Sequence, residues 1–469
     1  MSINKILLVN IGFIPESLGG TEFYTYNLAQ ELHKQGKKVT VLAAVDDLSL
    51  KRYSLSTSTI NGIHIYKIAN SHLYARTFKD FFINEKIDQI FKELVAQTQP
   101  DLIHFQHLAL LSGNLPKVAH ELHIPSVFTL HDYWMICHRS RLLRPGCGIC
   151  SGPSGGANCA TCDDGVTPNP IAVPKFPNAV QFLNKPSIKK TVTRALEIVP
   201  QKQIVHVRSK LFGTNPITIE PDAQTKDNSQ FRHDFLKRQL TYPQVIISPS
   251  HHLKGRFEDE GLENIQVVPL GFRPITPLKP LPFKNKLKIT FLGSLERHKG
   301  ITHVLNELLE FEHPSHKLEI NIYGYAKDPI YTAEAKKLAQ QFSAGNVCIH
   351  GSYRSDRDLE QIFANSHLVI FPSIWEENHP LVLREAILYG RPVIASNLGG
   401  VSEIIKHRKN GLLFNPHTHG DFVNQLTQVL DQPELLNTIT TGAVNTPVET
   451  LVQHAVSLSA IYEQAAASL

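Results

Sequence analysis

The sequence has no apolar run that approaches the roughly 18 residues needed to cross a bilayer, so we expect no membrane-spanning helix. It also has little excess charge: the formal net charge is +5 over 469 residues, which gives no argument for a nucleic-acid ligand. The opening KILLVNIGFI is interrupted by Asn10 and Gly12, and no small-residue cleavage site follows it. We therefore expect a first buried strand here instead of a signal peptide, and a cytoplasmic protein.

One region does carry an excess of basic side chains, with apolar residues between them: Lys185, Lys189, Lys190, Arg194, Lys202, Arg208 and Lys210. Such a run is more often a solvated helix face. It also fits a peripheral contact with anionic lipid, or with a lipid that carries a diphosphate, at the inner face of the membrane. The sequence leaves both interpretations open.

Length and the order of the expected elements indicate two domains. A chain of 469 residues is too long for one hydrophobic core, and its 42% hydrophobic and 19% charged content is that of an ordinary globular protein. Strands alternate with helices from Lys5 to Leu130 and again from Lys288 to Phe414. This alternation predicts an α/β fold with parallel sheets, in which ligands bind beyond the carboxyl ends of the strands.

The stretch from Pro372 to Gly400, PSIWEENHPLVLREAILYGRPVIASNLGG, predicts a short helix between two buried strands. We expect the helix to run from about Pro380 to Tyr389, because proline suits a first helical turn and Gly390 ends the run of helix formers. Asn378 or His379 can cap it. The amides at the start of such a helix make a site for phosphate.

Two carboxylates lie around that helix start. Glu377 precedes the helix and Glu385 lies about one and a half turns into it, while Leu381 and Val382 supply exposed amides. One carboxylate can reach hydroxyls at the far end of a phosphate-bearing ligand, and the other can reach its near side. As a bare pair, however, two solvated glutamates beside an amphipathic helix are the better interpretation.

Two other loops lead from a strand end into a helix. PESLGGT, with Gly19 and Gly20, permits close backbone approach before a helix start. GSLERHKG places Arg297 and Lys299 just before the next helix, as in a phosphate-binding loop. A Gly-Gly turn alone is more often a plain turn.

Three histidines follow strand ends. His131 comes directly after the strand that ends in VFTL, and His104 and His107 lie in DLIHFQHL. A lone histidine is more often structural than catalytic, and this chain has 24. The placement of His131 at a strand's carboxyl end makes it the stronger candidate, whereas His104 and His107 are weaker candidates for lining a ligand site.

Five of the six cysteines fall within 26 residues: Cys137, Cys147, Cys150, Cys159 and Cys162. The two Cys-x2-Cys pairs have the spacing of a structural four-thiolate zinc site, formed by Cys147, Cys150, Cys159 and Cys162. Cys137 is an alternative ligand in place of Cys147. Disulfides are the competing interpretation, but a cytoplasmic protein disfavours them.

Glu-x7-Glu at Glu377 and Glu385, followed by Ala, Gly, Pro-Val and Gly-Gly, resembles the signature of the retaining glycosyltransferases of family 4. The resemblance is strongest from Ile289 to Phe414 and weakest from Cys137 to Pro243. It implies the GT-B fold: two Rossmann-like, doubly wound parallel-sheet domains that face a central cleft, with a C-terminal helix that crosses back to the first domain.

The implied activity is transfer of a hexose from a UDP- or GDP-linked sugar to a hydroxyl of a saccharide or lipid-linked saccharide. Such a reaction serves the synthesis of cell-surface polysaccharide or glycoconjugates. The configuration at the anomeric carbon is retained, and members of the family need no catalytic metal. Rival interpretations are other GT-B chemistry, such as a sugar epimerase or phosphorylase, or an inactive carbohydrate-binding homologue.

The resemblance also assigns roles to residues. Lys299, Arg297, Gly20 and the amides of Leu381 and Val382 would contact the donor diphosphate. Glu385 would hold ribose hydroxyls, Glu377 a hydroxyl of the donor sugar, and Tyr353 and Arg354 the nucleotide base. His131 would lie by the anomeric centre.

One position departs from the family pattern. Arginine usually follows the glycine of the loop before Lys299, but this chain has Ser294 there. Arg297 is the candidate to supply the missing charge.

The expected domains are an N-terminal acceptor-side domain at 1–272 with a cysteine-rich insertion at 137–165, a proline- and lysine-rich linker at 273–285, and a nucleotide-sugar domain at 286–446. The returning helix is expected at 447–469.

Overall fold

The computed structural model describes residues 3–144, 146, 148–160, 162, 223–283, 286–310, 317–343, 346–353 and 356–469. The chain divides into two compact units, one made of the chain up to Gly271 with Leu451–Leu469 and the other of Phe272–Thr450. Three sequence-based predictions lie outside the described residues: the basic region at 185–210, Cys147 and Arg354. Among the described helices, none combines the length and apolar character that a membrane span requires.

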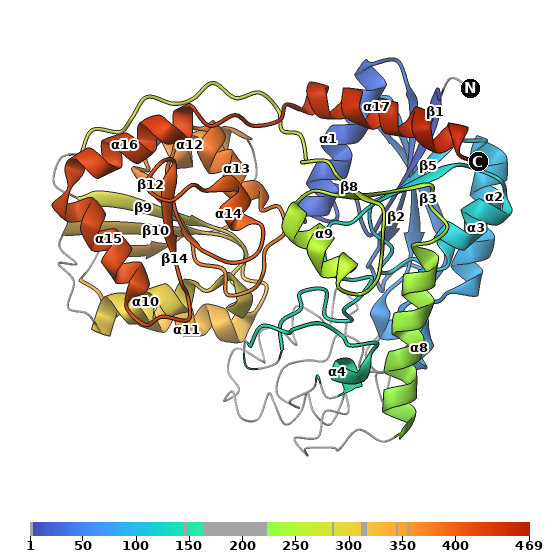
Figure 1. The fold of residues 1–469 in the computed structure, drawn as a ribbon, viewed down its shortest axis with the longest axis horizontal. Helices are drawn as coiled ribbons and strands as arrows, with labels where there is room; N and C mark the ends of the chain where they lie inside the picture. The colour runs from blue at the N-terminus through green and yellow to red at the C-terminus, as the bar shows by residue number, and fades with distance from the viewer. Residues whose placement is uncertain are drawn as a thin grey trace. The chain divides into compact units, whose positions relative to one another are not determined.

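An eight-stranded sheet forms the middle of the first unit (Figure 1). Its strands are β1 (Lys5–Asn10), β2 (Lys38–Val45), β3 (Leu55–Ile60), β4 (Ile63–Ala69), β5 (Leu102–Phe105), β6 (Ser126–Thr129), β7 (Val245–Ser248) and β8 (Ile265–Val267). Their order is β3-β4-β2-β1-β5-β6-β7-β8, and every neighbouring pair except β3 and β4 is parallel. Strands β5 and β6 are buried along their whole length, as in a sheet covered on both faces.

The sequence predicted an all-parallel sheet, and this prediction is wrong at the edge strand β3. It runs antiparallel to β4, and Asn61 and Gly62 turn the chain with φ angles of 49° and 81°. Asn-Gly supplies the two positive φ angles that a tight hairpin requires. Because β3 is exposed almost throughout, its side chains show no apolar alternation, and the sequence analysis missed it.

The described helices of the first unit are α1 (Gly20–Lys34), α2 (Glu85–Thr98), α3 (Leu115–Glu121), α4 (Ala157–Ala160), α8 (Ala223–Gln239), α9 (His251–Glu258) and α17 (Leu451–Ala467), with short 3-10 turns η1 (His72–Tyr74) and η2 (Phe78–Phe81). The last helix, α17, lies beside α1 in the unit that contains the N-terminus (Figure 1). Two buried hydrogen bonds fix it: Tyr24 Oη to His454 Nε2 at 2.6 Å, and His104 Nδ1 to Tyr462 Oη at 2.8 Å.

The second unit has a six-stranded, all-parallel sheet in the order β11-β10-β9-β12-β13-β14. Its strands are β9 (Leu287–Leu292), β10 (Leu318–Tyr323), β11 (Val347–Ile349), β12 (Leu368–Phe371), β13 (Val393–Ser396) and β14 (Gly411–Phe414). One apolar core packs the sheet against α10 (Ile301–Glu310), α11 (Pro329–Ala339), α15 (Asp421–Asp431) and α16 (Pro433–Val444). A second core packs it against α12 (Asp356–Ala364), α13 (Leu381–Leu388) and α14 (Val401–Ile404), so helices cover both faces.

The helix predicted at 380–389 is α13, and its start differs from the expected one. Pro380 is the N-cap residue and not the first residue of the helix, and no side chain caps it. Neither Asn378 nor His379 therefore has the capping role expected from the sequence. An uncapped start leaves the first amides of the helix to other partners.

Four histidines in the first unit are held neutral: His104, His138 and His454 are buried, and His131 is partly exposed. Burial lowers the pKa of His131 to about 3, with a further lowering by His107, and burial lowers the pKa of His454 to about 4. Burial together with the neighbouring arginines lowers the pKa of His138 to about 3. Burial, reinforced by His131 and His454, holds the pKa of His104 well below its usual range. Charging any of these rings would place a cation where water cannot solvate it.

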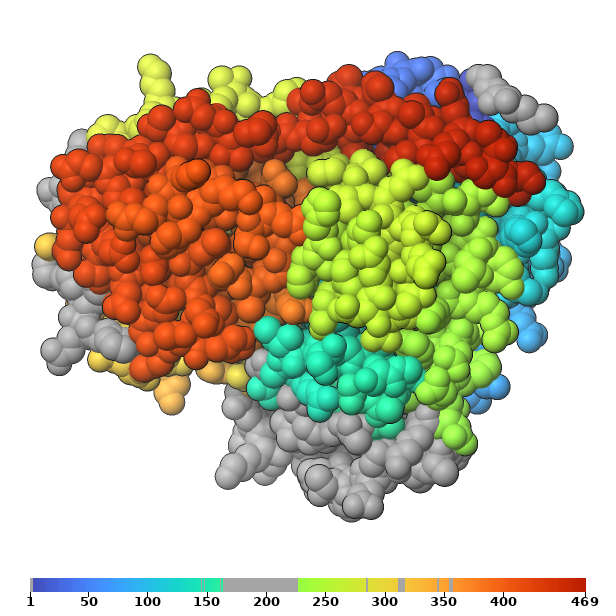
Figure 2. All heavy atoms as spheres, viewed as in Figure 1, coloured from blue at the N-terminus to red at the C-terminus, as the bar shows by residue number. Residues whose placement is uncertain are grey.

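The cysteine-rich segment lies on the surface of the first unit. Arg256 of α9 donates a hydrogen bond to the carbonyl of Cys150 at 2.6 Å, and Figure 2 shows the teal segment directly below the lime atoms that include α9. Burial, reinforced by the thiols of Cys137, Cys162 and Cys150, raises the pKa of Cys159 to about 12, so these four thiols are close enough to interact.

None of the five described cysteines is in a disulfide. The part of the chain that the structure describes also contains no group of three or more His, Cys, Asp or Glu side chains arranged to hold a metal ion. With Cys147 outside that part, the structural zinc site stays a prediction.

We expect acid to destabilise the fold more steeply than carboxylate titration alone would do. The four histidines stay neutral in the folded protein but bind protons near pH 6.5 once unfolded, so stability is lost as the pH falls below about 6.5. A pKa difference of one corresponds to about 1.4 kcal/mol, so each of these histidines should cost about 3 kcal/mol by pH 4. Urea unfolding followed from pH 7.5 to pH 4.5 measures this slope. His454→Gln should flatten it and the exposed control His64→Gln should not; equal slopes would contradict the explanation.

If the cysteine cluster binds zinc, elemental analysis of protein purified without chelators should find about one zinc ion per chain. Cys150→Ser and Cys159→Ser should lower the metal content, because each removes a thiolate ligand. Cys348→Ser, in β11, is the matched control and should leave the metal content unchanged. A metal content well below stoichiometric in the wild-type protein would remove the zinc hypothesis.

Candidate functional site

In the second unit, an ion pair joins the loops that follow two neighbouring strands, β9 and β12. Lys299 Nζ lies 2.6 Å from Glu377 Oε1, so the residue expected at the donor diphosphate and the residue expected at the donor sugar lie in direct contact. The Glu377 side chain is only 7% exposed, and that of Lys299 is 23% exposed. A partly exposed ammonium group held by a buried carboxylate is well placed to meet an anionic ligand.

Two glycines allow these loops to approach so closely. A Cβ at Gly300, which has a φ of 72°, would lie 1.9 Å from the carbonyl oxygen of Pro372. A Cβ at Gly399, with a φ of 62°, would lie 2.2 Å from the carbonyl oxygen of Glu377. Only glycine fits either position, so these two glycines bring the backbone beside Lys299 and Glu377 into place.

The start of α13 lies at the same carboxyl edge of the sheet, directly after Glu377. Its amides at Leu381 and Val382 have no side-chain cap, and the positive end of the helix dipole adds to their attraction for an anion. Further along the helix, Glu385 lies close enough to Tyr353 to interact: burial and then Glu385 raise the pKa of the Tyr353 phenol. Two more of the predicted residues are thereby brought together.

Arg297, the candidate to supply the missing charge at the diphosphate, and Ser294, which stands in place of the family's arginine, both have other partners. Arg297 pairs with Glu334 of α11 at 3.2 Å and lies over the ring of Tyr331, with both charged side chains exposed. Ser294 donates a hydrogen bond to Glu296 Oε2 at 2.7 Å. A role for Arg297 at the diphosphate stays a prediction.

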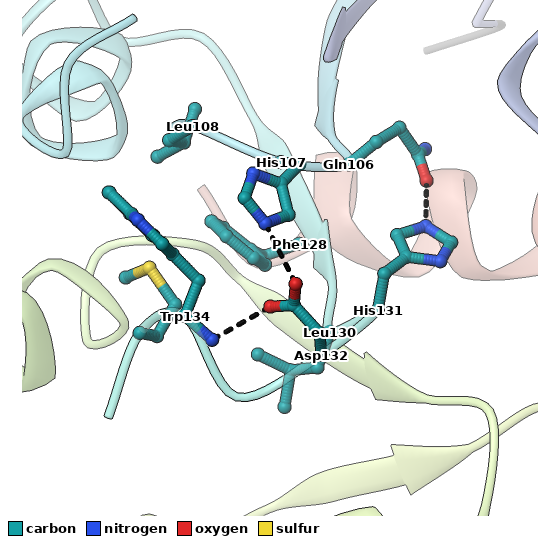
Figure 3. A pocket seen from close by; sticks show the side chains of 9 residues that line it. Gln106, His107, Leu108, Phe128, Leu130, His131, Asp132 and Trp134 are labelled. Carbon is teal, nitrogen blue, oxygen red and sulfur yellow. Dashed lines mark hydrogen bonds and ion pairs between the residues drawn. The ribbon is translucent and has the colours of Figure 1, made fainter. Parts of the chain in front are cut away.

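In the first unit, His131 follows β6 and lies at the carboxyl edge of the sheet. Its Nε2 donates to Gln106 Oε1 at 2.7 Å (Figure 3). The centroid of its ring lies 5.0 Å from that of Tyr24. A neutral imidazole that donates from Nε2 carries its lone pair on Nδ1. Gln106, which follows β5, was not a candidate from the sequence. Its position after a strand, beside His107, was the only sequence feature that could have identified it as a site residue.

His107 lies next to this pair and faces Asp132 (Figure 3). Its Nδ1 accepts from the amide of Ala109 at 3.2 Å, so its Nε2 is the donor to Asp132 Oδ2, also at 3.2 Å. Burial acts to raise the pKa of Asp132, but His107 and the amide of Trp134 outweigh it, and the pKa lies below its usual range. These residues line a cavity of about 10 Å³, which has room for about one water molecule.

His104 does not line this cavity. It is fully buried between Tyr462 Oη and Thr129 Oγ1, each at 2.8 Å. Its position supports the docking of α17, and it has no exposed surface with which to meet an acceptor.

The glycine loop before α1 already has a carboxylate beside it. Glu22 is buried, accepts a hydrogen bond from Ser17 at 2.5 Å, and lies so close to Gly19 that a Cβ there would be 2.3 Å from its Oε2. A negative side chain at the start of this helix disfavours a second anion there. Contact between Gly20 and a diphosphate therefore stays a prediction.

Comparisons with known proteins show the family to which the chain belongs. Residues 274–445 match the family described as glycosyl transferases group 1, and residues 18–146 match glycosyltransferase family 4. The two matched regions together cover more than half of the chain.

Named relatives are distant. A D-inositol 3-phosphate glycosyltransferase from Corynebacterium aurimucosum is 29% identical over 155 residues, which cover 32% of this chain and 36% of the relative. The putative colanic acid biosynthesis glycosyl transferase WcaC from Escherichia coli is 24% identical over 390 residues, covering 79% of this chain and 76% of WcaC. The first curated relatives are matched over only about two fifths of their own length.

Solved structures share the fold. Sucrose-phosphate synthase from Thermosynechococcus elongatus superposes with a TM-score of 0.64 at 16% identity, covering 99% of this chain and 100% of that one. HepE from Anabaena, solved in complex with UDP-glucose, gives a TM-score of 0.59 at 16% identity over 99% and 100% of the two chains.

The family resemblance and the fold expected from the sequence are thus confirmed. The protein belongs to the glycosyltransferases, with a family 4 region followed by a group 1 region, and has the GT-B fold.

Proposed function

We propose that the protein transfers a hexose from a nucleotide diphosphate sugar to a hydroxyl of a saccharide or lipid-linked saccharide, with retention at the anomeric carbon. The observation that carries the proposal is the contact between Lys299 and Glu377 beside the uncapped start of α13. It places a cation, a buried carboxylate and free amides at one strand edge, which is the set of groups that a sugar diphosphate requires.

Each group has a part in this reaction. Lys299 and the amides of Leu381 and Val382 bind the diphosphate, and they stabilise the negative charge that grows on it as the bond to the sugar breaks. Glu377 accepts a hydrogen bond from a hydroxyl of the donor sugar. Glu385 holds ribose hydroxyls, and Tyr353 lies beside it to contact the base.

His131 belongs to the first unit and is proposed to lie by the anomeric centre. Because its pKa of about 3 keeps the ring neutral, it acts by hydrogen bonding and not as a charge. Gln106 orients the ring through the hydrogen bond from His131 Nε2. The chemistry proposed here needs no catalytic metal.

The named relatives support the choice of donor and pathway. HepE binds UDP-glucose, WcaC is described as acting in colanic acid biosynthesis, and another relative is a lipopolysaccharide 1,2-N-acetylglucosaminetransferase from Salmonella typhimurium. By analogy, we propose a UDP- or GDP-linked donor and a role in the synthesis of a cell-surface polysaccharide or glycoconjugate.

Lys299→Ala should weaken binding of the nucleoside diphosphate by about 10- to 100-fold, because it removes a charge-assisted contact to phosphate. Glu385→Ala should weaken binding of the same nucleotide through the ribose. Calorimetric titration with UDP and with GDP measures both effects. Lys117→Ala, which breaks an exposed pair with Glu121, is the control and should bind like the wild type. Unchanged affinity in both site variants would contradict the proposed donor site.

His131→Ala should lower turnover by about 100-fold or more while leaving UDP or GDP affinity within about twofold, because the ring acts on the sugar and not on the diphosphate. Turnover is followed as release of nucleoside diphosphate from a panel of nucleotide sugars with saccharide acceptors. The exposed His64→Ala is the control. The anomeric configuration of the product, read by NMR, tests retention, and an inverted product would refute that part of the proposal.

A further inference from the structure

Two side chains that the sequence did not single out hold the carboxylate of Glu377. Ser373 Oγ donates to Glu377 Oε1 at 2.7 Å, and Trp375 Nε1 donates to the same oxygen at 2.8 Å. With Lys299 Nζ at 2.6 Å, three donors converge on one oxygen atom. Ser373, Trp375 and Glu377 are all buried, so their geometry is set by packing and not by solvent.

The convergence on Oε1 leaves the other oxygen for a different partner. In the described part of the chain, no residue donates a hydrogen bond to Glu377 Oε2, although a carboxylate can accept at both oxygens. A carboxylate fixed at one oxygen cannot rotate without breaking the hydrogen bonds that hold it. Its second oxygen therefore has a defined direction before any ligand arrives.

Trp375 also acts on Lys299. The Lys299 ammonium lies 5.6 Å from the centroid of the indole ring, within range of a cation–π contact. The ring of His298 also contacts the indole edge to face, with the ring centroids 5.9 Å apart and an angle of 82° between the ring planes. One indole thus contacts both members of the ion pair, through its N–H and through its ring face.

Ser373 and Trp375 have a property that Lys299 lacks: both are neutral. An arriving diphosphate competes with Glu377 for the Lys299 ammonium, and the ion pair loosens as the phosphate binds. The hydroxyl and the indole N–H carry no formal charge, so a phosphate attracts them less strongly than it attracts the ammonium group. They keep Glu377 oriented at the moment when Lys299 is shared.

We propose that Ser373 and Trp375 are positioning residues that hold Glu377 Oε2 toward a hydroxyl of the donor sugar, independently of Lys299. The inference rests on the proposed function and goes beyond it, because it assigns two residues that act through Glu377 and do not touch the donor. It predicts an effect on recognition of the sugar and no effect on recognition of the nucleotide.

The test compares affinities measured by calorimetry for two pairs of probes, UDP with UDP-glucose and GDP with GDP-mannose. Within each pair, the ratio of the affinity for the nucleotide sugar to the affinity for the nucleoside diphosphate gives the contribution of the sugar to binding. Ser373→Ala and Trp375→Phe should each reduce that contribution by about tenfold, as Glu377→Gln does, and leave UDP or GDP affinity unchanged. Ser373→Thr, which keeps a hydroxyl, should show the same sugar contribution as the wild type.

Two controls separate positioning from stability. Ser366→Ala removes a buried hydroxyl with hydrogen bonds to Ile362 and Thr290, at the opposite end of β12 from Ser373, and should leave the ratio unchanged. In the Glu377→Gln background, Trp375→Phe should have no further effect, because phenylalanine keeps an aromatic ring for the contact with Lys299 and the lost N–H acts only through that carboxylate.

The outcomes are distinct. If the wild type binds neither nucleotide nor nucleotide sugar, the proposed function fails and the inference fails with it. If the wild type shows a sugar contribution that Glu377→Gln removes but Ser373→Ala and Trp375→Phe leave intact, only the inference is overturned.

Discussion

The ion pair of Lys299 and Glu377 is the interaction on which the candidate site depends. β9 and β12 are neighbours in the sheet, so the loops after them emerge side by side, and the pair fastens one loop to the other. The backbone allows this only because Gly300 fits against the carbonyl of Pro372. An ion pair with a buried carboxylate and no further hydrogen-bond donors would add little to stability, since the cost of desolvation offsets the attraction between the charges. Ser373 and Trp375 supply those further donors.

In the first unit, the imidazole rings of several histidines are held neutral within the folded structure. His104, His131 and His454 all find hydrogen-bond partners, and two of those contacts involve side chains separated by more than 350 residues in sequence. The C-terminal helix α17 supplies His454 and Tyr462 and so completes a unit that is otherwise built from the N-terminal part of the chain. Because an unpaired buried polar group is costly, these contacts make α17 an integral part of that unit.

Much of the fold follows from local patterns, but side-chain partners do not. The alternation of buried strands with helices predicted both sheets, and the spacing around α13 predicted the helix within one residue at each end. The missed hairpin at Asn61 and Gly62 carried a recognisable turn signal, but its exposed edge strand lacked the apolar pattern. The charges of Arg297 and Glu22 can be read from the sequence, but their neighbours cannot. The contact of Arg297 with Glu334, and that of Glu22 with Gly19, are seen only in the folded chain.

The electrostatic character of the two candidate sets supports a division of roles between the units. The second unit offers Lys299 and uncapped helix amides, which suit an anion. The first offers a neutral His131 held by an amide oxygen, and it places the carboxylate of Glu22 where a phosphate was expected. Neutral donors and acceptors suit sugar hydroxyls, and a nearby carboxylate repels a diphosphate. On this argument an anion is favoured beside Lys299 and the start of α13, and it is disfavoured at the glycine loop before α1.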